Sequence, residues 1–229
     1  MEYSNKKKTK KLKINPESPR LVLDQNTEEI SVDNMLEEQE SYKNIHIKNC
    51  QLNSSNGVSF DSVYLSNIKG HDLYFERFAV NDTCFISCDF SMLEWRDSRF
   101  ERVEFVDCKL TGMQLNKSNI KNTLFKNCQC QLTQFSSSKL SSVRFDNCFM
   151  GDSLMVESKL ENTSLMNCQA QNLILQKNKF NNVDFRGSEL EDIQLDFDLF
   201  YKSNITLDVN QAIYILQRFS KIQILAMNE

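Results

Sequence analysis

A period of five residues constrains this chain more than any other feature of its sequence. Every fifth residue from Phe60 to Ile205 is apolar or small, and only Gly70, Cys130 and Ala170 in this series lack a large side chain. The series contains 12 of the 16 phenylalanines. A helix repeats about every 3.6 residues and a flat strand about every two, so neither accounts for this pattern. The sequence therefore predicts a repeat structure.

A second series, two residues ahead of the first, adds a longer period of twenty. One of its columns consists of five cysteines (Cys88, Cys108, Cys128, Cys148 and Cys168), and another of four serines (Ser98, Ser118, Ser138 and Ser158). Four pentads per turn predict a four-sided coil whose inward side chains stack on their equivalents in the coils above and below. Strand-like pairing between coils sets a rise of ~4.8 Å per coil, which gives a rod with a length of roughly 36 Å. We expect Phe85, Phe105, Phe125, Phe145 and Phe185 to form an aromatic column, broken by Leu165.

These repeats resemble those of the pentapeptide-repeat family, whose unit is a small residue, a polar residue, Leu or Phe, and two more polar residues. Two stretches match it directly: Cys108-Lys109-Leu110-Thr111-Gly112 and Ser188-Glu189-Leu190-Glu191-Asp192. The resemblance implies an all-β fold, a right-handed quadrilateral β-helix over residues 41–206. Asn178 and Asp198 depart from the pattern, because they are polar where the family prefers small residues.

The register slips once at the N-terminal side of the repeat. Tyr42, Ile47 and Leu52 are spaced by five, but Phe60 follows Leu52 after eight residues. We expect three extra residues to leave the wall as a small loop within residues 53–57. Such a loop is either a simple bulge or a contact for a partner protein.

Residues 1–40 have a different composition and form a separate segment. Six lysines lie between Lys6 and Lys13, and such a run predicts a flexible, solvated tail. Pro16 and Pro19 indicate an extended linker. Residues 24–40 then contain seven acidic residues and no Lys or Arg. The sequence contains no apolar run long enough for a signal peptide or a membrane span.

The period changes again after Ile205, where residues 207–229 predict a helix and a tail. Asp208 and Gln211 have the spacing of a capping box. Apolar residues follow at helical spacing in two adjacent stripes, one of which can cover the open end of the coil stack. We expect the other to form a homodimer interface through Ile213, Leu216, Phe219 and Ile222, with intramolecular packing of residues 222–225 as the alternative. Members of the family that bind topoisomerases also dimerise at this end.

The eight cysteines favour a reducing compartment over a disulfide framework. Five form the inward column, and small buried thiols suit the cytoplasm. A straight column of sulfurs cannot surround a tetrahedral zinc ion, so we expect no metal and no other cofactor. Cys84 occupies an outward position.

No catalytic constellation is evident in the sequence. The two histidines, His46 and His71, are expected on the surface, far from each other and without a nucleophile at a recognisable spacing. Phosphate-binding and dinucleotide motifs are absent from the sequence. A convex rod has no deep cleft in which paired carboxylates could be tuned. We therefore expect neither an enzyme nor a small-molecule substrate.

Charge points to a protein partner. The net charge is −4, but without residues 1–13 the remaining 21 basic and 30 acidic residues give −9. Five acidic residues gather near the end of the repeat (Glu189, Glu191, Asp192, Asp196 and Asp198). They form either a solvated surface or a strip for a basic partner. Direct contact with nucleic acid or membrane is not favoured, because Arg96, Arg99 and Arg102 are interleaved with acids.

The resemblance is to the quinolone-resistance type of pentapeptide-repeat protein. It implies a dimeric acidic rod that mimics duplex DNA, binds DNA gyrase or topoisomerase IV, and protects the enzyme from quinolone poisons. The alternative is a structural or adaptor module with an unrelated protein partner. A third hypothesis is direct DNA binding through the lysine-rich tail.

Overall fold

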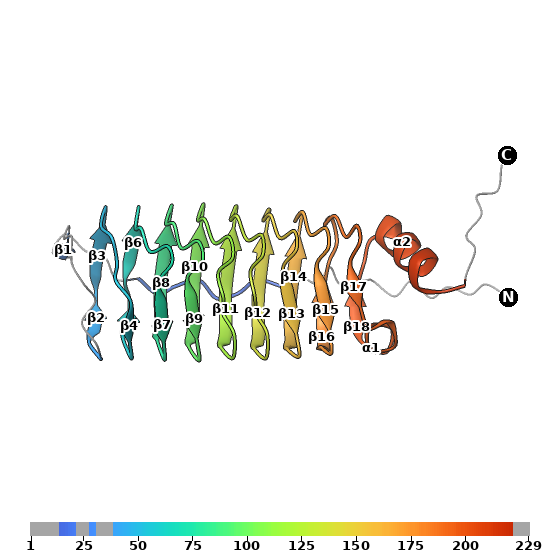
Figure 1. Cartoon of the computed structure of the whole chain (residues 1–229), viewed down its shortest axis with the longest axis horizontal. Helices are drawn as coiled ribbons and strands as arrows, with labels where there is room; N and C mark the ends of the chain where they lie inside the picture. The colour runs from blue at the N-terminus through green and yellow to red at the C-terminus, as the bar shows by residue number, and fades with distance from the viewer. Residues whose placement is uncertain (1–13, 22–27, 31–38, 222–229) are drawn as a thin grey trace, which may run out of the picture.

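The chain forms a parallel β-solenoid of about eight turns, seen from the side in Figure 1. The computed structural model describes residues 14–21, 28–30 and 39–221. The coils stack into an elongated body, and two short helices lie at its C-terminal end. The expected fold class, a four-sided β-helix with a C-terminal capping helix, is confirmed.

The first half of the chain contributes strands β1 (Glu28–Ile30), β2 (Ser41–Lys43), β3 (Ile45–Lys48), β4 (Ser55–Asn56), β5 (Ser59–Asp61), β6 (Tyr64–Ser66), β7 (Tyr74–Glu76), β8 (Ala79–Ile86), β9 (Glu94–Arg96) and β10 (Arg99–Val106). The second half contributes β11 (Asn119–Lys126), β12 (Lys139–Asp146), β13 (Leu154–Val156), β14 (Lys159–Met166), β15 (Ile174–Gln176), β16 (Lys179–Asp184), β17 (Gln194–Leu195), α1 (Phe197–Tyr201), β18 (Asn204–Thr206) and α2 (Val209–Phe219).

Each coil has four walls, which we number by the buried residue at the centre of each wall in one coil. Walls 1, 2, 3 and 4 are centred on Phe100, Phe105, Leu110 and Leu115. Equivalent residues of successive coils are twenty apart in the sequence, and we call each such series a column. The long strands, such as β10 and β11, cover walls 1 and 2 together in the twelve-stranded sheet. Wall 4 carries the two three-stranded sheets, whereas wall 3 is joined by single bridges from Gln51 to Glu189.

The corners between walls use left-handed backbone at non-glycine residues. Among the described residues, 28 non-glycine residues have positive φ, and the corner position two after each wall centre supplies nearly all of them. Asn and Asp tolerate this conformation better than most residues, which explains why so few glycines suffice. Asn side chains also link adjacent coils. The Asn147 amide donates to Asn127 at 3.0 Å, and the Asn127 amide donates to Asp107 at 3.0 Å.

The core consists of stacked, fully buried columns. The rings of Phe85, Phe105, Phe125 and Phe145 stack with centroids 4.7, 4.9 and 4.7 Å apart and interplanar angles of 9° or less, which confirms the expected aromatic column. In the serine column, the Ser138 N–H donates to Ser158 Oγ at 3.0 Å, and Ser138 Oγ donates to the Leu115 carbonyl at 2.7 Å.

Asn178 extends the serine column although it departs from the sequence pattern. Its amide oxygen accepts from the Ser158 N–H at 2.8 Å, and its amide nitrogen donates to the Met155 carbonyl at 2.5 Å. The amide thus reproduces both roles of the serine hydroxyl, which allows a polar group to remain buried there.

The loop expected within residues 53–57 does not form. Tyr42 pairs with Phe60, eighteen residues away, whereas Phe60 pairs with Val80 after twenty. The first coil therefore has two residues fewer than the next coil, and it does not contain three extra residues. Ser55 pairs with Phe75 as the centre of wall 4 and is buried. The five-residue pattern does not reveal this position, because a small serine stands where the other wall centres carry a large apolar residue.

At the C-terminal end the chain leaves the register after Leu195. Helix α1 replaces part of the next wall, and Ile205 pairs with Val183 instead of Phe185. The capping box of α2 is confirmed, because Asp208 Oδ1 accepts from the Gln211 N–H and Gln211 Oε1 accepts from the Asp208 N–H, both at 3.0 Å.

Helix α2 also satisfies the polar groups of the terminal coil. Gln211 Nε2 donates to the carbonyls of Phe185 at 2.6 Å and Ser188 at 2.7 Å. The Tyr214 hydroxyl accepts from the Asp192 N–H at 2.8 Å. The cap therefore occupies part of the open end of the stack, where unpaired backbone groups would otherwise be available for aggregation.

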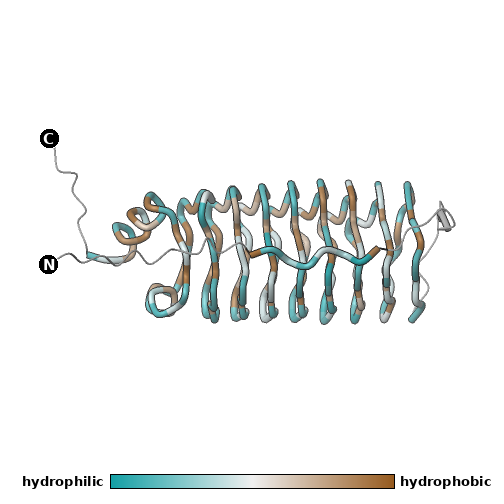
Figure 2. The backbone as a smooth tube through the Cα atoms, turned by 180° about the vertical axis from the view of Figure 1, so that it is seen from behind, coloured by the Kyte–Doolittle hydropathy of each residue, from teal (hydrophilic) through white to brown (hydrophobic). Residues whose placement is uncertain are grey.

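Residues 14–21 lie along the solenoid instead of standing apart from it. Figure 2 shows this extended segment crossing several coils. The Arg20 N–H donates to Asp82 Oδ1 at 2.9 Å, and Asn15 Oδ1 accepts from Arg144 at 3.2 Å, three coils further along. Ile14 is buried. The lysine run at residues 6–13 lies outside the described residues.

Asp82, which accepts from the Arg20 N–H of this segment, is itself held by a bidentate ion pair with Arg102. The Arg102 guanidinium donates to both Asp82 oxygens, at 2.7 and 2.8 Å, and the two side chains are only 17% and 12% exposed. Hydrogen bonds from Arg102 hold the pKa of Asp82 below its ordinary value of 3.8. Cys84, on the same strand, is also buried despite its outward register, and this burial raises its pKa to about 12.

Replacing Gln211 by Leu should destabilise the C-terminal cap. The variant loses the capping box and leaves the carbonyls of Phe185 and Ser188 without their donor, at a cost of about 2 kcal/mol. Chemical denaturation measures this cost, and Gln217→Leu, on the exposed side of the same helix, is the matched control. Equal stability of the two variants would contradict the capping role.

The Asp82–Arg102 pair should make the free energy of unfolding depend on pH in the acidic range. A carboxylate with a depressed pKa stabilises the folded state above its unfolded pKa and loses that contribution as pH falls through its folded pKa. Asp82→Asn should therefore lower the unfolding free energy by about 2 kcal/mol at pH 7, and by less as pH falls below about 3.8. Urea unfolding at several pH values checks this, with Asp61→Asn, whose pair with Lys43 is exposed, as the control. A constant difference across pH would exclude the pair as its source.

Candidate partner-binding surface

Charge is distributed unevenly over the four walls. Between residues 60 and 196, the outward positions of wall 3 carry two lysines (Lys69 and Lys109) and six acids (Asp72, Asp89, Asp152, Glu189, Glu191 and Asp192). Wall 1 has more basic than acidic residues at its outward positions. The basic residues are Arg99, Arg102, Lys121, Lys139, Lys159 and Lys179, and the acidic residues are Asp61, Asp82, Glu101 and Glu161. The acidity expected of the whole rod is therefore concentrated on wall 3.

Within wall 3, the acids cluster toward the C-terminal end. The N-terminal half pairs Asp89 with Lys109 at 3.8 Å and Asp72 with His71 at 3.2 Å. From the coil of Asp152 onward, the outward positions of this wall carry no Lys or Arg. This end of the wall thus carries four acids and no basic residue at its outward positions.

The structure places three of the five predicted partner-binding acids together. Glu189, Glu191 and Asp192 lie on wall 3 of the last regular coil, and all three are exposed. Asp196 lies around the corner, at the start of α1, and accepts from the Lys177 N–H at 2.5 Å. Asp198 belongs to α1 and is exposed, because the chain has already left the inward register there.

Two of the clustered acids already have partners within the chain. Asp192 accepts from Arg218 of α2 at 2.6 Å, and this hydrogen bond raises the pKa of Arg218. Glu189 accepts from Gln171 at 2.5 Å. Both contacts are exposed, so solvent and a cationic partner can compete for the carboxylates.

Wall 3 has a second feature that the inward five-residue pattern does not predict. Among the described residues, five large apolar side chains are exposed, and three of them lie on this wall: Met92, Leu132 and Phe149. All three occupy outward positions of the five-residue register. Their signal in the sequence is a large apolar residue at an outward position, where the equivalent residues of neighbouring coils are mostly polar or glycine.

The predicted dimer interface lies beside an apolar groove. A cavity of about 230 Å³ between α1, β18 and α2 is lined mainly by Phe197, Phe200, Tyr201, Ile205, Ala212 and Leu216. Ile213 and Leu216 are partly exposed, whereas Phe219 stacks on Phe197 at 6.1 Å. Ile215, which is not among the predicted interface residues, is buried by α2 together with Gln211. Ile222 lies outside the described residues.

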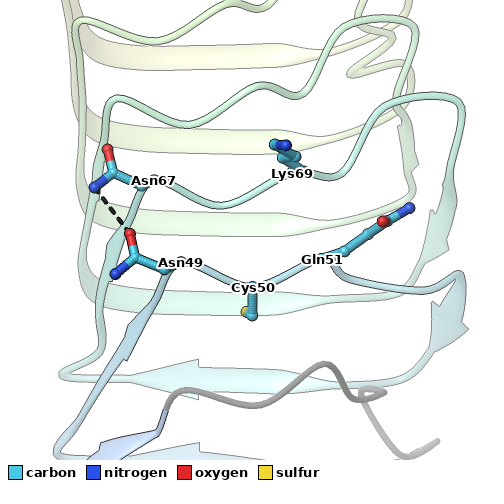
Figure 3. A pocket seen from close by; sticks show the side chains of 5 residues that line it. All are labelled: Asn49, Cys50, Gln51, Asn67 and Lys69. Carbon is cyan, nitrogen blue, oxygen red and sulfur yellow. Dashed lines mark hydrogen bonds between the residues drawn. The ribbon is translucent and has the colours of Figure 1, made fainter.

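A second cavity, of about 360 Å³, lies near the N-terminal end of wall 3 and is shown in Figure 3. Its described lining consists of Asn49, Cys50, Gln51, Asn67 and Lys69, with the Asn67 amide donating to Asn49 at 3.1 Å. These residues include no carboxylate and no imidazole, so they supply no acid–base pair.

The histidines take part in local contacts. His46 lies 2.9 Å from Ser66 Oγ with its ring edge against Tyr64, and His71 is exposed beside Asp72. Over the described residues, no three His, Cys, Asp or Glu side chains are arranged to hold a metal ion. In the same part of the chain, neither helix combines the length and apolarity of a membrane span. The eight cysteines are buried and free of disulfides.

Comparison with known families agrees with this repeat architecture. Residues 79–153 match the family model described as "Pentapeptide repeat region". The chain carries a pentapeptide repeat. Beyond the matched residues, the same register and walls continue in both directions, as the pairing of β5 with β8 and of β14 with β16 shows.

A solved structure of a fluoroquinolone resistance protein shares this fold. The trypsin-treated form of QnrB1, described as a plasmid-mediated fluoroquinolone resistance protein, is 17% identical over 87% of this chain and 98% of its own, with a TM-score of 0.53. Full-length QnrB1 is 19% identical over 82% of this chain and 98% of its own, with a TM-score of 0.46. A search of curated protein sequences finds no match.

Proposed function

We propose that this pentapeptide-repeat chain is a non-catalytic binding protein that presents wall 3 to a basic groove of a protein partner. The observation that carries the proposal is the gathering of three exposed carboxylates (Glu189, Glu191 and Asp192) at one end of a single wall. On that wall Glu191 extends beside Glu189 and Asp192, and its side chain makes no hydrogen bond or ion pair within the described residues. A surface of this kind attracts a basic partner and steers its approach.

The partner we propose is DNA gyrase or topoisomerase IV, whose protection from quinolones would be the biological outcome. The fold shared with QnrB1, itself described as a fluoroquinolone resistance protein, supports this choice. So does the rod shape, which offers a partner an elongated surface of the kind that a DNA-binding groove accepts (Figure 1). We further propose a cytoplasmic location, which eight reduced cysteines support.

Removal of two carboxylates from wall 3 tests this function. Glu189→Gln together with Glu191→Gln should weaken binding to purified gyrase or topoisomerase IV by roughly five- to thirty-fold at low salt, because each lost charge contributes about 0.5–1 kcal/mol. The wild-type affinity should fall as salt rises, and the double variant should show a weaker salt dependence. Titration of each enzyme at several salt concentrations measures both effects.

The matched control removes two carboxylates from wall 4, by Glu76→Gln and Glu157→Gln. Glu157 already pairs with Lys177 at 3.1 Å, so this change should leave binding within about twofold. Lack of binding by the wild-type chain to either enzyme at low salt would overturn the proposed function.

We also propose that the chain forms a homodimer through its C-terminal end. Two copies joined at the groove between α1 and α2 would cover its apolar lining and bring both acidic clusters near the centre of one longer rod. Isologous contact of this kind requires a self-complementary apolar patch, which Leu216 and Ala212 provide beside the exposed Tyr201.

Replacing Leu216 by Asp should convert the dimer into a monomer, because the new charge would be buried in the interface. Sedimentation equilibrium measures the mass, and the thermal midpoint should fall little because Leu216 is only partly buried in one copy. Gln217→Asp, one residue along on the exposed side, is the control. A monomeric wild type, or a dimeric Leu216→Asp variant, would contradict this interface.

A further inference from the structure

The middle of wall 3 presents an apolar band to solvent. We use this term for Met92, Leu132 and Phe149, whose exposed fractions are 54%, 52% and 43%. On adjacent wall 4, the half-buried Leu154 and Ile174 continue the apolar surface around the corner. Large apolar side chains that gather on one face in this way are typical of binding surfaces.

The fold itself does not require these three residues. The column of Phe149 has Gln129 directly before it and Gln169 directly after it, joined to it by backbone bridges. Leu132 and Met92 have φ of 60° and 58°, a conformation that favours Gly or Asn, and Asn172 occupies the same column two coils beyond Leu132. Polar residues would therefore satisfy these positions at least as well. Departures from local preference of this kind point to function.

Glycine keeps the band continuous and shallow. Gly112 lies between Met92 and Leu132 in the same corner column, and a Cβ on Gly112 would lie 2.3 Å from Met92 Sδ. The Met92 side chain thus lies flat over Gly112, toward Leu132. A Cβ on Gly151, two residues after Phe149, would meet no side chain within 4 Å, so the surface beside the ring is open.

The charges around the band define what fits it. On wall 3 between Lys109 and Glu189, Asp152 is the only charged outward residue. Phe149 is two coils from Glu189, or about 10 Å, and Leu132 is three coils from Asp192, or about 14 Å. A complementary surface must therefore be apolar opposite the band and cationic about 10–14 Å further along, opposite Glu189 and Asp192.

The other side of the solenoid is already covered in part. Residues 14–21 contact Asp82 and Arg144 on walls 1 and 2, on the side that Figure 2 shows in front. Wall 3 adjoins wall 2 but is opposite wall 1. In the described structure its apolar band is open to a partner along its whole length.

We propose that the apolar band of wall 3 is the docking surface for the basic groove of the proposed partner, and that the contact there is apolar. This inference rests on the proposed function and specifies how the groove is held. The band contacts an apolar part of the groove, while Glu189 and Glu191 bind its cationic side chains. Exposed apolar anchors surrounded by uncharged amides provide affinity that salt does not screen.

Substitutions copied from neighbouring coils test the band without disturbing the fold. Phe149→Gln reproduces Gln129 and Gln169, and Leu132→Asn reproduces Asn172. The double variant should keep the thermal midpoint of the wild type. It should bind purified gyrase or topoisomerase IV at least tenfold more weakly, with an unchanged slope of log affinity against log salt. The carboxylate variants on the same wall should instead flatten that slope.

Val209→Gln is the matched control, because it removes a 74%-exposed apolar side chain from the start of α2, away from the band. It should leave binding within about twofold. If the wild type binds and the band variant binds equally well, the docking surface is wrong while the proposed function stands. If the wild type binds neither enzyme, both are overturned. If the band variant changes the mass of the free protein in sedimentation, wall 3 is a contact between copies and the proposal is wrong.

Discussion

The structure depends on the pairing of each coil with the next at a spacing of twenty residues. Arg99 to Val106 pairs with Asn119 to Lys126, and the same pairing recurs along the body. A single coil cannot bury its own inward side chains, and the faces of the Phe105 ring are covered by Phe85 and Phe125 of the coils on either side. Backbone hydrogen bonding and core packing are therefore satisfied by the same neighbour.

This dependence leaves the outward positions free to differ from wall to wall. Inward residues must match their columns, but an outward residue contacts mainly solvent and its two column neighbours. Wall 1 can therefore carry lysines and arginines paired with acids, as Lys121 pairs with Glu101, while wall 3 carries exposed apolar and acidic residues. A rod built in this way has four nearly independent surfaces, and its binding properties belong to a wall rather than to the whole molecule.

The ends of the stack need separate solutions, because a terminal coil has a neighbour on one side only. At the C-terminal end Gln211, Asp208 and Tyr214 supply the hydrogen bonds that a further coil would provide. At the other end β1 pairs with β3 before the first full coil. These additions have no five-residue period, since each fits an edge and not a wall.

The sequence by itself determined the register, the four-sided coil, the aromatic and cysteine columns, and the capping box at Asp208. All of these follow from periodicity or from local spacing, which can be read along the chain. Only the tertiary structure decided that Ser55 takes the place of a large apolar wall residue, that α1 displaces the chain after Leu195, and that Asn15 and Arg20 lie against Arg144 and Asp82. The physical reason is the same for all three. Each depends on which surface a non-repeating segment meets in space, and a repeat carries information only about its own neighbours.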